Sequence, residues 1–301
     1  MYSINNIPLE TFGIIAGRAN NSTIALSGHL DMPKRLGKAF QNWDDEQGLE
    51  PYVNIDEITF EGRDLVFNGY LKATDKQMAL NQLTSLYSNL NALTDLVPFS
   101  TPWGVYEVYI QDEIEAQYIG NGAAQLEIIF REPIVLVTAQ VPNGTSEEIY
   151  NIDGVALKSL GAFVTEVQGN FYNPKHKEAR FTAYGSEGFQ ITKTESLLIE
   201  TSLVFAAETY TELAANVQKL HKLLAAPGTR KMNVDGKARE CFNVEGFEVN
   251  SIKIANNLAI CQLTFEMLTA RDGDPLDTGY MLDNEYNNIV TNLYELIKIK
   301  S

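Results

Sequence analysis

Residues 31–52 read DMPKRLGKAFQNWDDEQGLEPY, and a related stretch, NPKHKEARFTAYGSEGFQITK, occupies residues 173–193. In each stretch a Pro-Lys pair is followed, ten residues after the proline, by an aromatic residue and then by an acidic turn. The shared positions are Pro33, Lys34 and Trp43 in the first stretch, and Pro174, Lys175 and Tyr184 in the second. Recurrence after about 140 residues is typical of a duplicated domain. The sequence therefore predicts one fold built twice, with a long polar hairpin or loop here whose aromatic residue is a buried anchor.

Short patterns on either side of this stretch repeat in the same order. Residues 4–13 and 152–161 match at an offset of 148, and each predicts two short strands joined by a two-residue Asn-Asn or Asp-Gly turn. The letters Leu-Val-Phe at residues 65–67 recur at residues 203–205, an offset of 138. Alternating apolar residues predict strands at both places, and a further strand with a bulge over residues 53–60.

Each copy then changes to helical periodicity. Apolar stripes predict amphipathic helices near residues 75–92 and 210–226, and both starts carry a capping-box pattern. The stripes are Leu80, Leu83, Tyr87 and Leu90, then Leu213, Val217, Leu220 and Leu224, and the capping pairs are Thr74 with Gln77 and Thr209 with Glu212. Alternating apolar residues close the copies at 126–130 and 261–265, an offset of 135. A steady fall in offset from 148 to 135 predicts that the second copy lost loop residues while keeping its elements.

These patterns together predict an α+β fold that is mainly β. Residues 1–135 and 149–270 are expected to form two tandem β-sandwich or half-barrel domains, each flanked by one helix. The polar residues 136–148 form the linker between them. Beyond a second polar joint, an apolar stripe predicts a C-terminal helix over residues 284–300, outside the duplication.

The charge balance excludes several classes of partner. The chain has 39 acidic and 23 basic residues, a formal net charge of −16. Such an excess argues against binding nucleic acid through its phosphates and against docking on anionic lipid. No apolar run approaches the length of a membrane span, and the N-terminus does not resemble a signal peptide. Cys241 and Cys261 lack CxxC spacing and a neighbouring histidine cluster, which predicts core residues rather than metal ligands.

Candidate chemical groups are few, and each has a simpler interpretation. The acidic groups at residues 44–46 and at 272–277 have the composition of an acid/base pair and of a calcium loop, but solvated or capped turns explain them better. The histidines His29, His176 and His221 are scattered, without a nucleophile motif, and are expected to be packing residues. We therefore expect no enzyme, no metal and no cofactor. The basic cluster of Lys34, Arg35 and Lys38 is either a solvated loop or a loop that pairs with a neighbouring acidic subunit.

The order of these parts resembles the N-terminal tube-type domain of bacteriophage distal tail proteins. The motif residues are Asp31, Pro33, Arg35, Trp43, Asp45 and Gly48, followed by the closing Phe-Arg-Glu-Pro at residues 130–133. The resemblance covers residues 1–135 directly and residues 149–270 through the internal repeat. The second half departs from the family, whose members typically carry an unrelated C-terminal sandwich. Two tube-type domains in one chain are more similar to baseplate hubs.

The resemblance implies a structural protein of a phage or prophage tail tip or baseplate, located in the virion. Its copies would form a ring, of six chains or of three with pseudo-sixfold symmetry, through which DNA passes without specific binding. Further partners implied are the tail-tube, hub and tape-measure proteins. The residues expected at the subunit interface are Pro33, Lys34, Arg35, Lys38, Trp43 and Asp45, with Pro174, Lys175 and Tyr184 as their second-copy equivalents. The alternative is a tandem β-sandwich that binds host-surface glycans, for which Trp103 and Tyr106 are the candidate aromatic platform.

Overall fold

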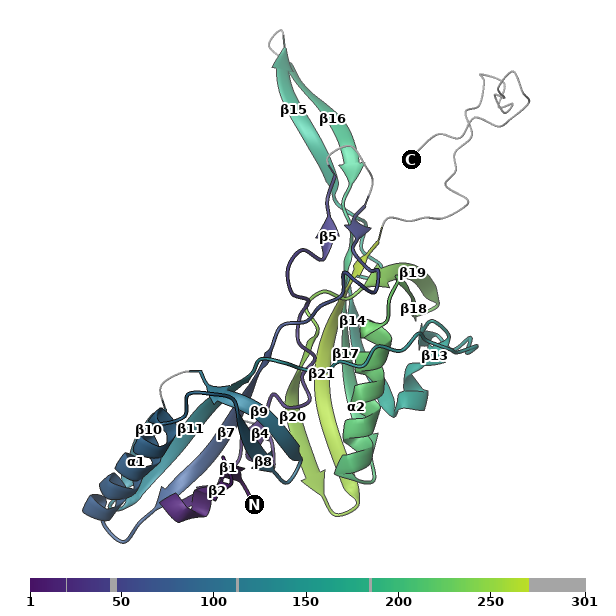
Figure 1. Cartoon of the computed structure of the whole chain (residues 1–301). Helices are drawn as coiled ribbons and strands as arrows, with labels where there is room; N and C mark the ends of the chain where they lie inside the picture. Colours follow the sequence, from purple (N-terminus) through teal and green to yellow (C-terminus); the bar gives the residue numbers. More distant parts are fainter. Residues whose placement is uncertain (20, 44–47, 112–113, 184–185, 271–301) are drawn as a thin grey trace, which may run out of the picture.

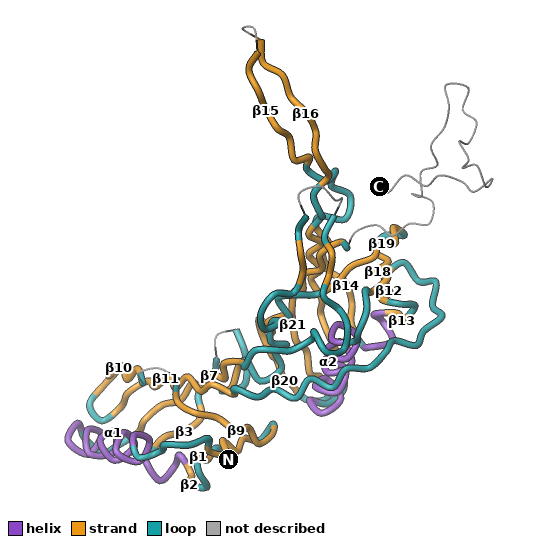
Figure 2. Tube along the Cα trace, turned by 45° about the horizontal axis from the view of Figure 1, so that its top comes forward, coloured by secondary structure: helices purple, strands orange, loops and turns teal. Residues whose placement is uncertain are grey.

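The computed structural model describes residues 1–270, except 20, 44–47, 112–113 and 184–185. The described chain is mainly β, with two α-helices, as Figures 1 and 2 show. This confirms the predicted α+β class. The C-terminal helix predicted over 284–300, the acidic groups at 44–46 and 272–277, and Tyr184 lie outside the described residues.

The first half is built on one curled nine-stranded sheet. Its strand order is β2-β1-β8-β9-β11-β7-β3, with β10 added beside β11 and β4 beside β7. Helix α1 packs against it. The elements are β1 Ser3–Ile4, β2 Ile7–Pro8, the 3-10 helix η1 Leu9–Phe12, β3 Ile14–Ala16, β4 Leu26–Ser27, β7 Arg63–Lys72, α1 Lys76–Asn91, β8 Val97–Thr101, β9 Gly104–Ile110, β10 Glu115–Gly120 and β11 Ala123–Glu132.

The second half is built on an eight-stranded sheet with the order β13-β12-β18-β19-β21-β17-β14, and β20 lies beside β21. Each strand of this sheet has a counterpart at the same place in the first sheet, as the predicted duplication would require. The elements are β12 Tyr150–Ile152, β13 Val155–Ala156, η2 Leu157–Leu160, β14 Ala162–Gln168, β17 Leu198–Ala207, α2 Tyr210–Ala225, β18 Arg230–Val234, β19 Lys237–Phe242, β20 Phe247–Ala255 and β21 Leu258–Thr269.

The predicted hairpin turns at the start of each half are present. Asn5 and Asn6 have φ values of 47° and 64°, and Asp153 and Gly154 have 49° and 74°. Two consecutive residues with positive φ form the type I′ turn that suits the twist of a two-residue hairpin. A 3-10 helix follows in both halves and ends at a glycine with φ 71°.

The sheet registers correct the alignment of the two copies. Leu71 and Phe205 are counterparts, because they pair with the residues that follow the two left-handed glycines, Ile14 and Ala162. They lie 134 positions apart (205 − 71), as do the two helices. The Leu-Val-Phe match at offset 138 is therefore out of register by four residues. Side chains alternate with period two along a strand, so an even slip preserves the buried face and conceals the error.

The offset also does not fall steadily. Leu71 pairs with Ala124 and Phe205 pairs with Cys261, so the offset at the closing strands is 137 (261 − 124). It falls from 148 to 134 and then rises. The second copy is shorter in some connections and longer in others.

The helices lie where the periodicity placed them, with differences at α1. Asp75, not Thr74, caps α1, because its carboxylate accepts from the Met78 N–H at 2.8 Å. The buried stripe of α1 is shifted, and Leu80 is exposed. In α2 the predicted stripe is buried and the Thr209 hydroxyl accepts from the Glu212 N–H at 3.2 Å. The buried residues of the α1 stripe are Ala79, Leu83, Leu86 and Leu90.

Residues 53–60 do not form the predicted strand. The Asn54 and Glu57 backbones form a turn, with the Glu57 N–H donating to the Asn54 carbonyl at 3.0 Å. The Glu57 carboxylate accepts from the Asn54 N–H and holds this turn. Ile55 therefore points into solvent rather than onto a sheet. The apolar alternation is interrupted because a local turn satisfies the backbone first.

Each half carries a two-stranded hairpin that belongs to neither main sheet. In the first half β5 (Phe40–Gln41) pairs with β6 (Glu50–Pro51), and in the second β15 (His176–Ala183) pairs with β16 (Ser186–Thr194). Figures 1 and 2 agree that β15 and β16 stand away from both sheets. These hairpins are the repeated stretch from which the duplication was predicted.

Trp43 is not the buried anchor of its hairpin. Its side chain is 45% exposed, and its indole N–H donates to the Glu50 carboxylate at the surface. Leu49 takes the anchoring role, because it packs with Phe242 of the second half, as does the partly buried Phe40. The prediction failed because Trp43 lies at the surface, whereas Leu49 and Phe40 of the same stretch reach Phe242.

Candidate functional site at the joint between the halves

The two halves meet where the first half covers a sheet edge of the second. Residues 22–35 of the first half run along β20, which pairs with β21 on its other side. The Thr23 N–H donates to the Ile252 carbonyl at 2.8 Å. Met32 and Phe247 exchange two hydrogen bonds, of 2.9 and 3.1 Å. An unpaired edge strand exposes a row of donors and acceptors, and here the first half satisfies the edge of β20.

The sequence builds this joint through an insertion. In the second half β14 pairs along β17 from Ala162 to Gln168, whereas residues 17–19 and 21–25 of the first half lie outside the strands, between β3 and β4. The looped segment reaches β20, where the Ser22 and Thr23 hydroxyls accept from the N–H groups of Ile252 and Ile254, at 3.0 and 2.7 Å. The Asp31 carboxylate accepts from the Val249 N–H at 2.8 Å.

Apolar side chains make the joint part of a core. Ile24, Leu30 and Met32 of the first half are buried in the hydrophobic cluster of the second half, together with Phe247 and the α2 stripe. Burying an aliphatic side chain of this size contributes about 1.5–3 kcal/mol. The contact therefore resembles the interior of a domain, not a loose contact between neighbours.

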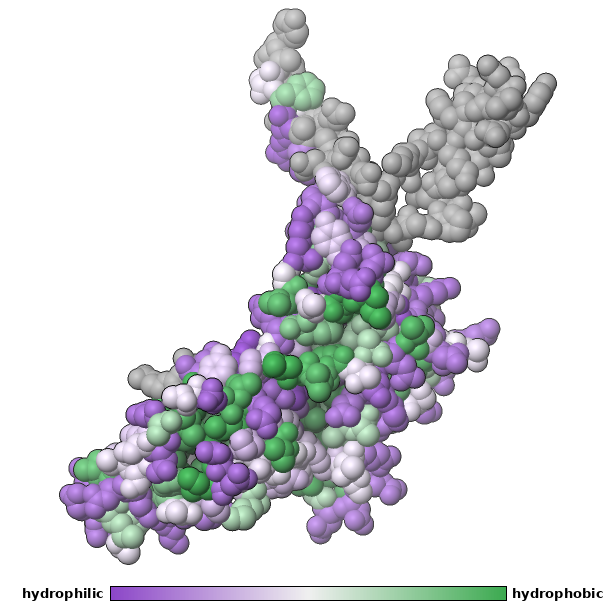
Figure 3. Space-filling model, viewed as in Figure 1, coloured by the Kyte–Doolittle hydropathy of each residue, from purple (hydrophilic) through white to green (hydrophobic). Residues whose placement is uncertain are grey.

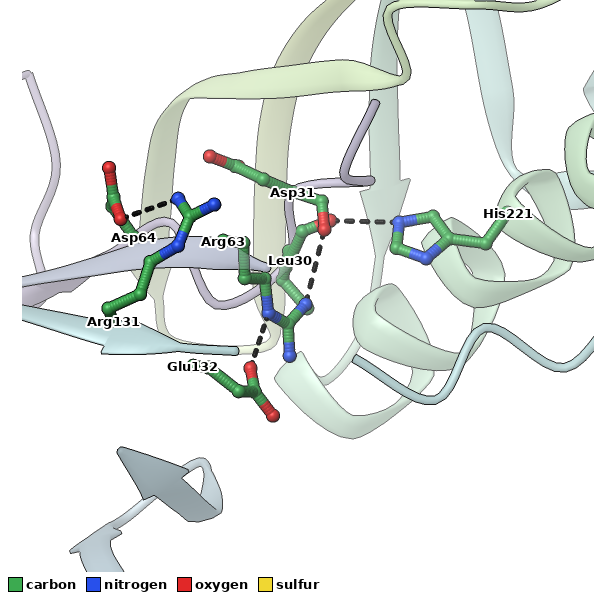
Figure 4. Close-up of polar contacts among 7 residues, drawn as sticks. All are labelled: Leu30, Asp31, Arg63, Asp64, Arg131, Glu132 and His221. Atoms are coloured by element: carbon green, nitrogen blue, oxygen red, sulfur yellow. Dashed lines mark hydrogen bonds and ion pairs between the residues drawn. The ribbon is translucent and has the colours of Figure 1, made fainter. Parts of the chain in front are cut away.

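A charged cluster closes the joint beside this apolar contact, as Figure 4 shows. The Arg63 guanidinium donates to the Glu132 carboxylate at 2.7 Å and to the Asp31 carbonyl at 3.1 Å. His221 of α2 lies 3.0 Å from the Leu30 carbonyl. A second ion pair, Arg131 with Asp64 at 2.8 Å, lies further out. Arg63, at the start of β7, thus connects the adjoining ends of β7 and β11 to the segment that covers β20.

Burial sets the charge state of the groups around Arg63. Desolvation, with the nearby Arg63 charge, lowers the pKa of His29 to about 3. Desolvation lowers the pKa of His221 to about 4, against the hydrogen bond to Leu30. Burial raises the pKa of Asp31 to about 7, opposed by the hydrogen bond from Val249. Both histidines are therefore neutral at pH 7, and the positive charge beside them is that of Arg63.

Aromatic rings line a cleft of about 520 Å³ at the same joint. The Tyr210 ring stacks with His29 and lies 4.3 Å from the Trp103 ring, and the two side chains of Tyr210 and His29 are hydrogen-bonded. The Arg63 guanidinium lies 5.7 Å from the Tyr106 ring. Trp103 and Tyr106, the candidate glycan platform, are thus partly buried and engaged with neighbouring side chains.

The side chains at the joint hold the two halves together by packing and hydrogen bonds. Among the described residues no cluster of three or more His, Cys, Asp and Glu side chains could hold a metal ion. His29 and His221 are buried packing groups, and Cys241 and Cys261 are buried core residues, as predicted. The prediction is wrong for His176, which is exposed in the β15–β16 hairpin. No helix in the described chain combines the length and apolar character needed to cross a bilayer.

The predicted interface residues divide between this joint and the surface. Pro33 and Arg35 are buried, and Arg35 donates to the Tyr52 carbonyl at 2.9 Å. Lys34 is exposed, 3.7 Å from Glu61, and Lys38 lies over the Tyr52 ring. Lys175 is exposed, and Pro174 is half-buried. Asp45 and Tyr184 lie outside the described residues.

Sequence reasoning missed the residues that hold the joint. Arg63 and Glu132 stand directly opposite each other on β7 and β11, but only the strand register brings them together. Glu132 belongs to the Phe-Arg-Glu-Pro motif, which was assigned to the end of the domain and not to a contact. Ser22 and Thr23 lie in an insertion that has no second-copy equivalent, so the repeat could not reveal them.

Comparisons with known proteins add a structural likeness. No family model matches the chain, and no curated protein matches it. Among solved structures, the chain is similar to the SPP1 Dit protein, whose title describes it as a paradigm of the hub adsorption apparatus in phages that infect Gram-positive bacteria. The TM-score is 0.33 at 10% sequence identity, over 88% of this chain and 98% of that chain. A likeness at this level carries no assignment of function.

Proposed function

We propose that this chain is a structural protein of a phage or prophage tail tip or baseplate, without enzymatic activity. Its copies form a closed ring that continues the tail tube as a conduit for DNA. Its two halves, residues 1–135 and 149–270, serve as tail-tube-like domains. Its partners in the virion are itself and the neighbouring tail-tube, hub and tape-measure proteins, and assembly takes place in the host cytoplasm.

The observation that carries this proposal is the side-by-side joint of two like units. Residues 22–35 of one unit cover the β20 edge of the other, and the β5–β6 hairpin of the first lies over Phe242 of the second. A ring of such units repeats one heterologous contact until it closes. Closure covers this strand edge in every unit. Two units joined in this way within one chain are what a segment of such a ring requires.

The charge of the chain suits a conduit for DNA. With 39 acidic and 23 basic residues, the protein as a whole repels phosphate. DNA that must slide through a channel cannot be held by rows of Lys and Arg, because each neutralised phosphate adds affinity. At the joint, the mostly buried guanidinium of Arg63 is neutralised by the Glu132 carboxylate.

The surface also suits assembly. On the face seen in Figure 3, apolar surface extends from the first half across the joint to the second half. Exposed large apolar side chains on the first half include Ile15, Tyr70, Val105, Tyr109 and Ile119. Extended apolar surface on a water-soluble protein marks a contact site. Neighbouring virion proteins would cover it.

An electron-microscopy reconstruction of the assembled tail tip tests this function. We expect the chain in a ring on the tail axis, with its channel coaxial with the tube and its lumen poor in Lys and Arg. A single copy on the periphery, or a lumen lined by basic residues, would overturn the proposal and favour the glycan-binding alternative. A purified chain that stays monomeric is compatible with it, because the adjoining proteins can act as the template.

A further inference from the structure

The two halves differ in what covers their edge strands. The counterpart of β20 in the first half is β10, because Ala116 pairs with Leu126 as Val249 pairs with Leu263. β20 is covered by residues 22–35. β10 pairs with β11 and has no other strand partner among the described residues. The strand edge that is covered in the second half is therefore uncovered in the first half.

Side chains near these edges show the same difference. Phe242, which the first half's hairpin covers, is 1% exposed, whereas its counterpart Tyr109 is 43% exposed. Ile252, which the Ser22–Thr23 segment covers, is 3% exposed, and its counterpart Tyr118 is 42% exposed. These counterparts follow from the strand registers, in which Tyr109 pairs with Arg131 as Phe242 pairs with Leu268.

A groove lies where the covering segment would sit. In the second half, Leu30 and Met32 fill the space between α2 and the start of β20, next to Phe247 and below the His221 ring. The corresponding place in the first half is a groove of about 940 Å³. Its lining includes the counterparts of the residues that contact Leu30 and Met32 or lie beside them, namely Tyr87, Leu90, Tyr109 and Ile114.

The second half also carries an unused copy of the covering segment. The Asp31 N–H donates to the Gly28 carbonyl and the Tyr172 N–H donates to the Gly169 carbonyl, both at 3.1 Å, which aligns residues 28–34 with 169–175. Leu30 is 5% exposed, but its counterpart Phe171 is 67% exposed. Tyr172 beside it is also exposed. Two adjacent exposed aromatic side chains before a Pro-Lys pair are therefore available to a partner.

We propose that residues 170–175 of one chain dock on the β10 edge of a second copy of this chain. Phe171 enters the groove between α1 and β10, and Asn173 pairs with Ile114 as Met32 pairs with Phe247. The β15–β16 hairpin then lies over Tyr109, as the β5–β6 hairpin lies over Phe242. The contact is shorter than the internal joint, because the second half lacks the insertion that places Ser22 and Thr23 on β20.

This inference names the contact between chains and rests on the proposed ring only for its closure. The first and second halves alternate around the assembly, because every second half faces the first half of the next chain. A ring of six domains then contains three chains. The proposed contact therefore favours a ring of three chains over a ring of six.

A disulfide across the proposed contact tests it. Met32 and Phe247 exchange both backbone hydrogen bonds, and residues so paired have Cα atoms about 5.5 Å apart, which suits a disulfide. The test protein carries Asn173→Cys and Ile114→Cys in the full chain. The matched control carries Asn173→Cys and Ser85→Cys, with the second cysteine on the exposed face of α1. The native Cys241 and Cys261 are buried and serve as a common background.

Oxidation is carried out on concentrated protein and on assembled tails. We expect disulfide-linked dimers and trimers from the Asn173→Cys/Ile114→Cys protein and only monomers from the control. Mixing the two single-cysteine chains should yield dimers only. The substitution Phe171→Asp changes an exposed side chain, so the chain should still fold, and it should lower the linked fraction at least tenfold.

The possible results separate the contact from the function. Links in solution from a chain absent from the tail axis would support the contact and overturn the ring. A ring on the axis in which oxidation gives no link between positions 173 and 114 would overturn the contact and leave the function intact. Equal linking by the test and control proteins would also overturn it.

Discussion

The backbone of Met32, in the first half, pairs with that of Phe247, in the second, through two hydrogen bonds of 2.9 and 3.1 Å. The Met32 side chain is 2% exposed and lies in the core of the second half. One residue thus extends the sheet and fills the core of a domain to which it does not belong. The stability of the second half therefore depends on the first.

Replacing Met32 by alanine should destabilise the second half. A large-to-small change at a buried site costs about 2–5 kcal/mol, and denaturant unfolding will measure the loss. Hydrogen exchange should quicken along β20 and less in the distant β7. The matched control is Leu36→Ala, an exposed residue in the same stretch, which should cost less than about 0.5 kcal/mol. Equal losses from both substitutions would show that Met32 is not part of that core.

The ion pair of Arg63 and Glu132 should matter more than its neighbour. Both of its side chains are 13% exposed, so Glu132→Gln leaves a mostly buried guanidinium without its anion, and we expect a loss of about 3 kcal/mol. The pair of Arg131 and Asp64 is more exposed, and Asp64→Asn should cost about 0.5 kcal/mol. Thermal unfolding of the two variants, side by side, measures the contrast. A larger effect of Asp64→Asn would contradict the role given to Arg63.

Asp31 should make the joint weaken as pH rises. Burial raises the pKa of its carboxyl from 3.8 to about 7. Between these values the folded chain binds more protons at this site than the unfolded chain, so stability falls with rising pH, by about 1.4 kcal/mol per pH unit at most. Asp31→Asn keeps an oxygen acceptor for the Val249 N–H and removes this dependence. Relative to wild type, the variant should therefore gain stability between about pH 4 and 7.

The quantity to measure is the difference in unfolding free energy between wild type and Asp31→Asn, as a function of pH. His29 and His221 have lowered pKa values, and they make stability rise with pH over an overlapping window. Both proteins contain them, so their contribution cancels in the difference. Carboxyl-carbon NMR of Asp31 gives the midpoint directly. A midpoint near 4, with parallel stability curves, would show that Asp31 is well solvated.

The sequence predicted the elements better than their register. Apolar periodicity located both helices within a residue or two, and the Asn-Asn and Asp-Gly turns identified the opening hairpins. The Leu-Val-Phe identity misplaced β17 by four residues, because a strand's pattern is unchanged by an even slip. The Trp43 anchor failed for a different reason. Burial depends on what lies beneath a side chain, and only the fold shows that Phe242 receives Leu49 instead.

The contacts at the joint could not be predicted from local sequence patterns. We predicted that Lys34, Arg35 and Lys38 share one interface. Their burial differs, however, because it depends on the backbone position of each residue. Arg35 is buried and donates to the Tyr52 carbonyl, while Lys34 and Lys38 stay at the surface. The ion pair of Arg63 and Glu132 links residues far apart in the chain. Contacts of this kind follow from strand pairing, which short-range periodicity does not encode.

Two glycines provide a test of whether the halves share one backbone. Gly28 has φ 83°, and a Cβ there would lie 1.9 Å from the Asp64 carbonyl oxygen. Gly169 has φ 85°, and its Cβ would lie 2.0 Å from the Leu198 carbonyl oxygen. Asp64 and Leu198 are counterparts in the two registers. Alanine should therefore be similarly disruptive at both sites, with a loss above about 3 kcal/mol.

Gly37 is the matched control, because it has a similar φ of 77° but open space around it. Gly37→Ala should cost only the strain of the left-handed backbone, about 1 kcal/mol. Calorimetry of the three single variants compares the losses. If Gly169→Ala behaves like Gly37→Ala while Gly28→Ala does not, the second half does not repeat the close approach of the first. The segment at residues 170–175 would then not be presented as residues 29–34 are.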